Sequence, residues 1–206
     1  MLALLDTGQD LDACESEIGV RVGQLLTPLT RYRLQDPHRP WAIDNGAYAR
    51  FEPRSFRSLL EREKARREEC LFVSAPDVVG SARRTLEVFS HWRHELSGWR
   101  RAFVCQDGQE NLPIPWSHID AVFIGGSTTW KSSQHVVQII KAAQALEKWV
   151  HIGRVNDPER WLYFEELGAD SCDGTGLARY THMRSSINGR HRQHPLFSGD
   201  SAGQTP

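Results

Sequence analysis

The regular alternation of two kinds of segment most constrains the fold of this 206-residue chain. Short apolar runs typical of β-strands alternate with longer stretches of helix-forming residues, without a hairpin signal between them. Consecutive strands are therefore expected to run parallel, because parallel strands need crossover connections. The expected strands cover residues 2–5, 20–26, 41–44, 70–75, 101–105, 119–124, 149–152 and 169–173, and the expected helices cover 10–18, 55–69, 81–96, 133–147 and 157–167.

Eight strands of this kind match the number in a closed (β/α)₈ barrel. A length of 206 residues lies near the lower limit for that architecture. The first expectation is therefore an α/β fold with a compact TIM-like (β/α)₈ barrel, and an open doubly wound parallel sheet is the alternative. The barrel is expected to form one domain over residues 1–180.

Composition and charge exclude several classes of protein. Hydrophobic residues make up 39% of the chain, charged residues make up 25%, and the formal net charge is -1, as in an ordinary globular domain without a global basic field. No apolar run is long enough for a membrane span or a signal-peptide core, so no membrane partner is expected. No Gly-rich nucleotide-binding pattern is present either.

The four cysteines, Cys14, Cys70, Cys105 and Cys172, lie far apart in the sequence and form no C-x-x-C motif. This spacing suggests neither a zinc site nor a disulfide framework. We therefore expect no metal or other cofactor, and a cytoplasmic location.

The region from Gly174 to Gly199 contains no Asp or Glu but several basic residues. Two interpretations stay open for it: a disordered, mildly basic tail, or a patch that binds a phosphate backbone. Residues 181–206 are expected to form a basic and then polar tail outside the barrel. The candidate nucleic-acid-binding residues are Arg179, Arg184, Arg190 and Arg192.

Polar residues or glycines stand at the ends of five expected strands: Asp44, Asp77, Gln106, the pair Gly125-Gly126, and Asp173. Each alone has an ordinary explanation as a turn, cap or loop residue. In a parallel barrel, however, the carboxyl ends of the strands share one mouth, where chemistry is placed. Three carboxylates, an amide and backbone donors suit a neutral ligand rich in N–H groups, such as a guanine-type base.

Strand alternation separates the two aspartates near the end of the last strand. Residues 169, 171 and 173 share one face, whereas 170 and 172 share the other. Asp173 is therefore expected at the mouth, beside Gly174 and Gly176, which would let a ligand approach closely. Asp170 is expected to face the helices, as a cap or paired with a basic side chain.

At this point the residues resemble a known family, the queuine/preQ1 tRNA-guanine transglycosylases and their relatives, the 7-deazaguanine DNA transglycosylases. The motifs that carry the resemblance occur in the family's order between about Trp41 and Arg179. They are Asp44-Asn45-Gly46-Ala47-Tyr48, Phe72-Val73-Ser74-Ala75-Pro76-Asp77, Val104-Cys105-Gln106-Asp107-Gly108, Ile124-Gly125-Gly126, Ile152-Gly153-Arg154-Val155-Asn156-Asp157-Pro158 and Gly168-Ala169-Asp170-Ser171-Cys172-Asp173.

The resemblance implies a role for each matched residue. Asp173 would be the nucleophile at the sugar carbon, and Asp44 the general acid/base. The remaining matched residues would bind the base: Asp77 and Gln106 through its pyrimidine edge, Gly125 and Gly126 through backbone groups, and Tyr48 by stacking. A buried structural aromatic is the alternative for Tyr48.

The chain also departs from the tRNA enzymes. It lacks residues for their zinc site of three cysteines and one histidine, its Gly174-Thr175-Gly176 segment differs from theirs, and it is much shorter. These differences favour the compact DNA-modifying relatives of phages and bacterial defence islands. The implied function is exchange of guanine in DNA, or alternatively in tRNA, for a 7-deazaguanine such as preQ0.

Two further classes of function stay open. An N-glycosidase or nucleoside hydrolase would use the same carboxylates with water as acceptor. A non-catalytic nucleic-acid-binding subunit would retain a degenerate site, although such a subunit has no need of both Asp44 and Asp173.

Overall fold

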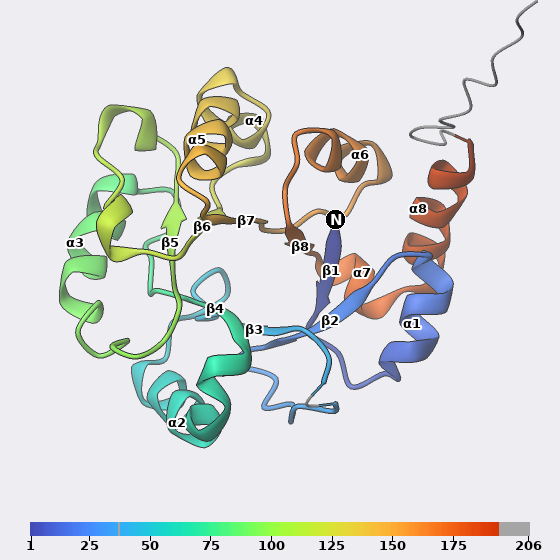
Figure 1. Cartoon of the computed structure of the whole chain (residues 1–206), viewed down its shortest axis with the longest axis horizontal. Coiled ribbons are helices and arrows are strands. Elements are labelled where there is room, and N and C mark those ends of the chain that lie inside the picture. Colours follow the sequence, from blue (N-terminus) through green and yellow to red (C-terminus); the bar gives the residue numbers. More distant parts are fainter. Residues whose placement is uncertain (37, 194–206) are drawn as a thin grey trace, which may run out of the picture.

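The computed structural model describes residues 1–36 and 38–193, with side chains as far as residue 189. Eight parallel strands follow one another in chain order and close into a barrel, since β8 pairs with β1 (Figure 1). The fold prediction of a TIM-like barrel is therefore confirmed, and the open sheet is wrong. The strands are β1 (Leu2–Leu5), β2 (Val22–Leu26), β3 (Trp41–Ile43), β4 (Cys70–Ser74), β5 (Arg101–Cys105), β6 (Ala121–Ile124), β7 (Trp149–Ile152) and β8 (Ser171–Asp173).

Helices surround the ring of strands on the outside (Figure 1). They are α1 (Leu11–Ile18), α2 (Pro53–Glu63), α3 (Ala82–Trp92), α4 (Thr128–Lys131), α5 (Gln134–Ala145), α6 (Pro158–Glu166), α7 (Thr175–Arg179) and α8 (Thr181–Gln193). Between β5 and β6 the chain forms only the 3₁₀ turns η2 (Gln109–Asn111) and η3 (Trp116–His118). This economy in connecting helices explains how so short a chain completes a barrel.

Local sequence signals set the helix ends. Asp10 caps α1 by accepting the amides of Asp12 and Ala13, and Gly19 ends the helix with a φ of 75°. The strand β2 begins at Val22, two residues later than expected. The expected helix over residues 55–69 is also shorter, because α2 ends at Glu63 and continues as the 3₁₀ turn η1 (Lys64–Glu69).

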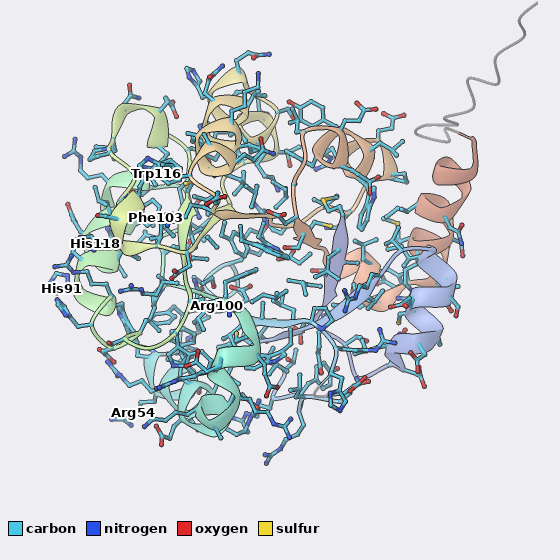
Figure 2. All side chains as sticks on the ribbon, viewed as in Figure 1. Arg54, His91, Arg100, Phe103, Trp116 and His118 are labelled. Atoms are coloured by element: carbon cyan, nitrogen blue, oxygen red, sulfur yellow. The ribbon has the colours of Figure 1, made fainter. Side chains whose placement is uncertain are left out.

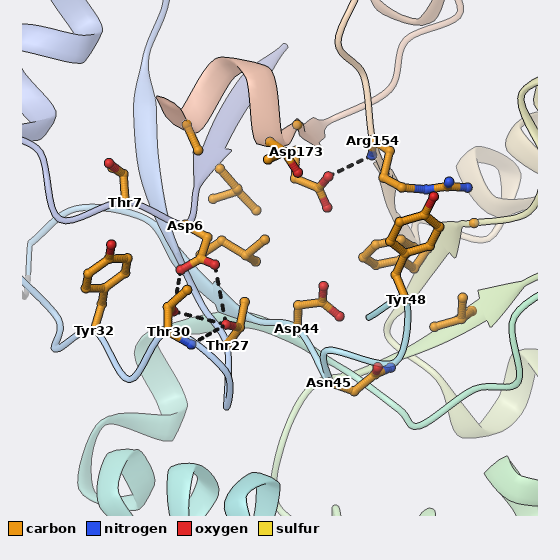
Figure 3. Close-up of a pocket in the computed structure, with 18 of the residues that line it drawn as sticks. Asp6, Thr7, Thr27, Thr30, Tyr32, Asp44, Asn45, Tyr48, Arg154 and Asp173 are labelled. Carbon is orange, nitrogen blue, oxygen red and sulfur yellow. Dashed lines mark hydrogen bonds between the residues drawn. The ribbon is translucent and has the colours of Figure 1, made fainter. Parts of the chain in front are cut away.

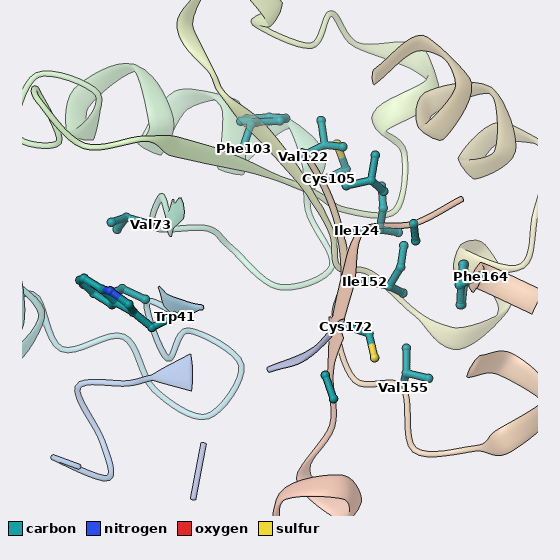
Figure 4. Close-up of a cluster of buried hydrophobic side chains, with 14 of the residues drawn as sticks. Trp41, Val73, Phe103, Cys105, Val122, Ile124, Ile152, Val155, Phe164 and Cys172 are labelled. Carbon is teal, nitrogen blue, oxygen red and sulfur yellow. The ribbon is translucent and has the colours of Figure 1, made fainter. Parts of the chain in front are cut away.

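Two apolar layers hold the barrel together. The interior contains mainly Leu4, Leu25, Ala42, Phe72, Ala102, Val104, Ala121 and Phe123. A larger cluster fills the space between the strands and the helices, and it includes Trp41, Ile124, Ile152, Phe164 and Cys172 (Figure 4). In Figure 2, Phe103 lies between β5 and α3, where its ring meets Phe89 edge-on at 5.2 Å, whereas Arg54 and His91 lie at the periphery. Alternate strand residues thus face the two layers.

The segment after β8 differs from the expected tail. It forms α7 and then α8, which packs against α1 and α6 (Figure 1). The start of the segment is therefore part of the barrel's helical layer, and placing the tail's boundary at residue 181 was wrong. Residues 194–206, the polar end of the expected tail, lie outside the described residues.

Arg184 explains why α8 docks. Its side chain is 2% exposed and forms an ion pair of 2.5 Å with Glu17 of α1. It also donates to the Leu177 carbonyl oxygen at 2.6 Å and to Gln9 Oε1 at 2.9 Å. The prediction that Arg184 contacts nucleic acid is therefore wrong, because the guanidinium is buried and bonded to groups of the protein.

We expect Arg184→Ala to lower the free energy of unfolding by about 2–3 kcal/mol, because Glu17 loses its buried partner. Denaturant unfolding measures this loss. Arg179→Ala is the matched control, since Arg179 is exposed at the end of α7 and should leave stability within about 0.5 kcal/mol of the wild type. Equal stability of the two variants would contradict the assigned role of Arg184.

Within the described residues, no helix is long and apolar enough to cross a membrane.

Candidate active site

A cavity of about 460 Å³ opens at the carboxyl ends of the strands. All eight strand ends contribute to its wall, which is expected for the mouth of a parallel barrel. In strand order from β1 to β8, the residues contributed are Asp6, Thr27, Asp44, Asp77, Gln106, Gly125, Arg154 and Asp173. The expected residues Asp44, Asp77, Gln106, Gly125, Gly126, Tyr48 and Asp173 therefore line a single cavity.

Two donors hold the carboxylate of Asp173. Its Oδ1 accepts the backbone amide of Arg154 at 2.7 Å, and its Oδ2 lies 3.3 Å from Nε2 of His151. The side chain is 13% exposed and faces the cavity (Figure 3). Asp173 is thus a fixed carboxylate with an open side, as a nucleophile requires.

His151 was not predicted from the sequence. Its imidazole is buried inside the barrel, where its ring centroid lies 4.5 Å from that of Phe123. Nδ1 lies 2.8 Å from Ser171 Oγ, which also accepts the indole N–H of Trp149 at 2.8 Å. Because the indole only donates, the Ser171 hydroxyl proton is free to point to Nδ1. In the tautomer that this arrangement favours, Nε2 carries a proton and donates it to Asp173.

The glycine after Asp173 has a structural role. A Cβ on Gly174 would lie 2.3 Å from the carbonyl oxygen of Val155, so the two backbones approach too closely for any side chain. The amide of Gly176 donates to Asn156 Oδ1 at 2.7 Å. These contacts tie the β7 loop to the β8 loop. The glycines thus serve the packing of two loops, in addition to the ligand access expected from the sequence.

Asp44 has a different environment from Asp173. Its Oδ1 accepts the Ser74 hydroxyl at 3.0 Å and the Gly46 amide at 3.3 Å. Burial, followed by the negative charges of Asp173 and Asp77, raises the pKa of Asp44 to about 7. Asp44 can therefore exchange a proton near neutral pH, which suits a general acid/base.

Asp77 and Gln106 pair with each other. Gln106 Nε2 donates to Asp77 Oδ2 at 2.7 Å, and Asn45 Nδ2 donates to Asp77 Oδ1 at 2.9 Å. Burial raises the pKa of Asp77, and these two amides oppose the rise. Any ligand at this wall would therefore meet a connected polar network and not two independent side chains.

The backbone donors expected at Gly125 and Gly126 are already used, which corrects that expectation. The Gly125 amide donates to the Cys105 carbonyl oxygen at 2.9 Å, and the Gly126 amide donates to Gln106 Oε1 at 3.1 Å. Gly126 adopts a φ of 68°, a conformation that favours glycine. The pair thus shapes the wall of the cavity, and neither N–H group is free for a ligand.

Tyr48 stands at the rim and is 66% exposed, so the alternative of a buried structural aromatic is wrong. The Arg154 guanidinium lies 4.1 Å from the centre of its ring (Figure 3). Arg154 also donates to the Gly126 carbonyl oxygen. Arg154, which the sequence analysis missed, has a φ of 58° that is unusual for a non-glycine residue. Its main chain holds Asp173 while its side chain covers one edge of the cavity.

Asp6 is a further carboxylate missed from the sequence. It follows β1, and its Oδ1 accepts the Thr30 hydroxyl at 2.6 Å while its Oδ2 lies 3.4 Å from the Thr27 hydroxyl (Figure 3). Burial raises the pKa of Asp6. In the sequence, an Asp-Thr-Gly segment after a short apolar run carries no specific signal for a functional site.

Asp170 occupies the opposite face from Asp173, as alternation predicted. Its Oδ2 accepts the backbone amide of Val150 at 2.7 Å, so its partner is the β7 main chain and not a helix cap or a basic side chain. Of the other predicted residues, Arg179 lines the cavity and is exposed, whereas the side chains of Arg190 and Arg192, in α8, lie outside the description.

Gln106→Ala is expected to lower stability and to weaken binding of the guanine-type base that the sequence resemblance implies. Gln106 Oε1 accepts the Gly80 amide at 3.0 Å as well as the Gly126 amide, so the substitution leaves two amides without a partner. Each unsatisfied group costs about 1–3 kcal/mol. Calorimetric titration with guanine measures the change in binding, and denaturant unfolding measures the change in stability. Wild-type values in both would place base recognition elsewhere.

Among the side chains of residues 1–36 and 38–189, no group of three or more His, Cys, Asp or Glu residues is arranged to hold a metal ion. All four cysteines are buried as free thiols.

Comparison with known proteins identifies no family. No family model and no curated protein matches the chain. Solved structures similar to it include a cube-shaped, highly porous protein cage designed by fusing symmetric oligomeric domains. The two share 14% sequence identity with a TM-score of 0.44, over 93% of this chain and 72% of that chain.

Proposed function

We propose that this protein is a base-exchange transglycosylase, which replaces guanine in a polynucleotide with a 7-deazaguanine such as preQ0. One observation carries the proposal: two carboxylates with contrasting environments face the same cavity. Two nitrogen atoms hold the Asp173 side chain in place, while the pKa of Asp44 is raised to about 7. Such a division is typical of sites that cleave glycosidic bonds through a covalent intermediate.

In the first step, an Asp173 oxygen bonds to the anomeric carbon as the bond to guanine breaks. The bonding electrons go to the base, and protonated Asp44 supplies the proton that the departing base needs. In the second step, the incoming base gives a proton to Asp44 and attacks the anomeric carbon, which releases Asp173. Two displacements retain the configuration at the sugar, and both carboxyl groups return to their starting states.

The test is incubation of the protein with DNA or tRNA and isotopically labelled preQ0, followed by measurement of label in each polymer and of released guanine. DNA is the first arm, in line with the expectation from the sequence. A duplex would need its guanine flipped out, at a cost of a few kcal/mol. Label incorporation matched by guanine release supports base exchange. Guanine release without incorporation would instead identify an N-glycosidase, and neither signal with either polymer would count against catalysis.

A further inference from the structure

One part of the cavity has no role in the proposed base exchange. The closed barrel orders its strand ends around a ring, in which β1 lies between β8 and β2 and opposite β5. Asp6, which follows β1, therefore lies across the cavity from Gln106, which follows β5. In Figure 3, Asp6, Thr27 and Thr30 gather on one side of the pair Asp44 and Asp173, and Asn45, Tyr48 and Arg154 lie on the other. We call Asp6, Thr27 and Thr30 the β1–β2 corner.

This ring order fixes which part of a nucleoside reaches the β1–β2 corner. A base at the wall formed by Asp77 and Gln106 places its glycosidic bond near the two catalytic carboxylates. The sugar must then extend toward β1 and β2. Register supports this placement, because Leu4 of β1 pairs with Asp173 of β8, and Asp6 is two residues further along the chain.

The corner has the chemistry of a hydroxyl receptor. Asp6 uses one strong hydrogen bond, from Thr30 at 2.6 Å, and a long one of 3.4 Å from Thr27. A carboxylate has about four acceptor positions, so capacity remains on the cavity side. Four carboxylates but only two arginines, Arg154 and Arg179, line the cavity, which makes it a poor site for a phosphate.

We propose that the β1–β2 corner binds the 2′-hydroxyl of the target nucleoside, with Asp6 as the acceptor, and that the substrate sugar is therefore ribose. The 2′-hydroxyl is attached to the carbon next to the reacting centre. It is also the one pentose hydroxyl left free within a polynucleotide chain. Its hydrogen bond strengthens as positive charge develops at the anomeric carbon. This inference rests on the proposed base exchange and replaces its initial preference for DNA with a preference for a ribonucleoside unit.

The test separates the target sugar from the surrounding polymer. Four oligonucleotides of one sequence are compared: RNA with guanosine, RNA with 2′-deoxyguanosine, DNA with 2′-deoxyguanosine and DNA with guanosine. Exchange should follow the sugar of the target and not the polymer. Guanosine should react at least about 10-fold faster, the usual size of a hydrogen bond to a charged group. Equal rates for the two sugars would overturn the inference.

Variants locate the effect. Asp6→Asn keeps an oxygen for Thr30 but removes the charge, so it should slow exchange at guanosine about 10-fold or more and leave 2′-deoxyguanosine unchanged. Asp120→Asn is the matched control, because Asp120 accepts the Arg101 amide at the amino ends of the strands, opposite the cavity. A loss in Asp6→Asn that is equal for both sugars would contradict the assignment. If Asp6→Asn does not fold, the rates of the wild-type protein on guanosine and 2′-deoxyguanosine still test the inference.

A binding measurement distinguishes failure of the inference from failure of the proposed function. Calorimetric titration with guanosine and 2′-deoxyguanosine should give tighter binding of guanosine, with the difference lost in Asp6→Asn. Discrimination in binding without exchange on any oligonucleotide would reject base exchange but retain the sugar site. Exchange without discrimination would retain the reaction and reject the sugar site. No binding and no exchange would reject both.

Discussion

Asp173→Asn should reduce base exchange by about 10⁴-fold or more, because the substitution removes the negative charge that attacks the anomeric carbon. The fold should survive. The new side-chain amide can keep its oxygen on the Arg154 N–H, and its NH₂ group can donate to His151 Nε2 if the imidazole adopts the other tautomer. Ser171 Oγ can then accept from both Trp149 and His151. Exchange rates and thermal unfolding of the two proteins measure both expectations.

Asp170→Asn is the control for this variant, as the same chemical change three residues away on the opposite face. It weakens the acceptor for the Val150 amide and should cost about 1 kcal/mol of stability without loss of activity. A direct observation complements the rates: wild-type enzyme denatured during turnover should carry a sugar adduct on Asp173, detectable by mass spectrometry. An adduct on Asp170, or normal exchange by Asp173→Asn, would end the assignment.

Asp44→Asn should lower exchange by about 10²–10⁴-fold, since the variant cannot move the proton of the base. The same variant should be more stable than the wild type at pH 8. A pKa raised from 3.8 to about 7 means that ionisation of Asp44 is less favourable in the folded chain than in the unfolded one. The wild type therefore loses stability as pH rises from about 4 to about 7, and the loss is complete above that range.

Denaturant unfolding at pH 4 and pH 8 tests the sign of this change in stability with pH. The stability difference between Asp44→Asn and the wild type should be small at pH 4 and should reach up to about 4 kcal/mol in favour of the variant at pH 8. Ser74→Ala is a useful comparison, because it removes a donor to Asp44 and should raise its pKa further. A variant whose advantage shrinks with rising pH would contradict the electrostatic account.

The sequence predicted the barrel because its strands and helices carry strong local signals. The bounds of β1, β5 and β7 are as expected, and Asp44, Asp77, Gln106 and Asp173 line one cavity. Such residues stand directly after apolar strands, so their positions follow from chain order alone. The predictions could not include pairings between strand ends, such as the Gln106 contacts that occupy Asp77 and the Gly126 amide.

Other failures have the same physical origin. Arg184 lies in a segment without acidic residues and was predicted to be a surface residue, but its contacts include Glu17, 167 residues earlier, and Gln9. Asp6 and His151 are candidate site residues because of their hydrogen bonds to residues of neighbouring strands and loops. Local sequence patterns predict the alternation of strand residues and the positions of strand ends. They do not predict burial or hydrogen-bond partners that depend on contacts distant in sequence.

The pairing of β1 with β8 has a consequence for how the protein is made. Leu4 and Asp173 become neighbours only when nearly the whole barrel has left the ribosome, so no shorter nascent chain contains a complete cavity. Until then, β1 and the most recently made strand both present unpaired edges, which are prone to join other chains. A closure contact so distant in sequence is also slow to form. During synthesis the chain therefore passes through an interval in which the cavity is incomplete and two strand edges are exposed to aggregation.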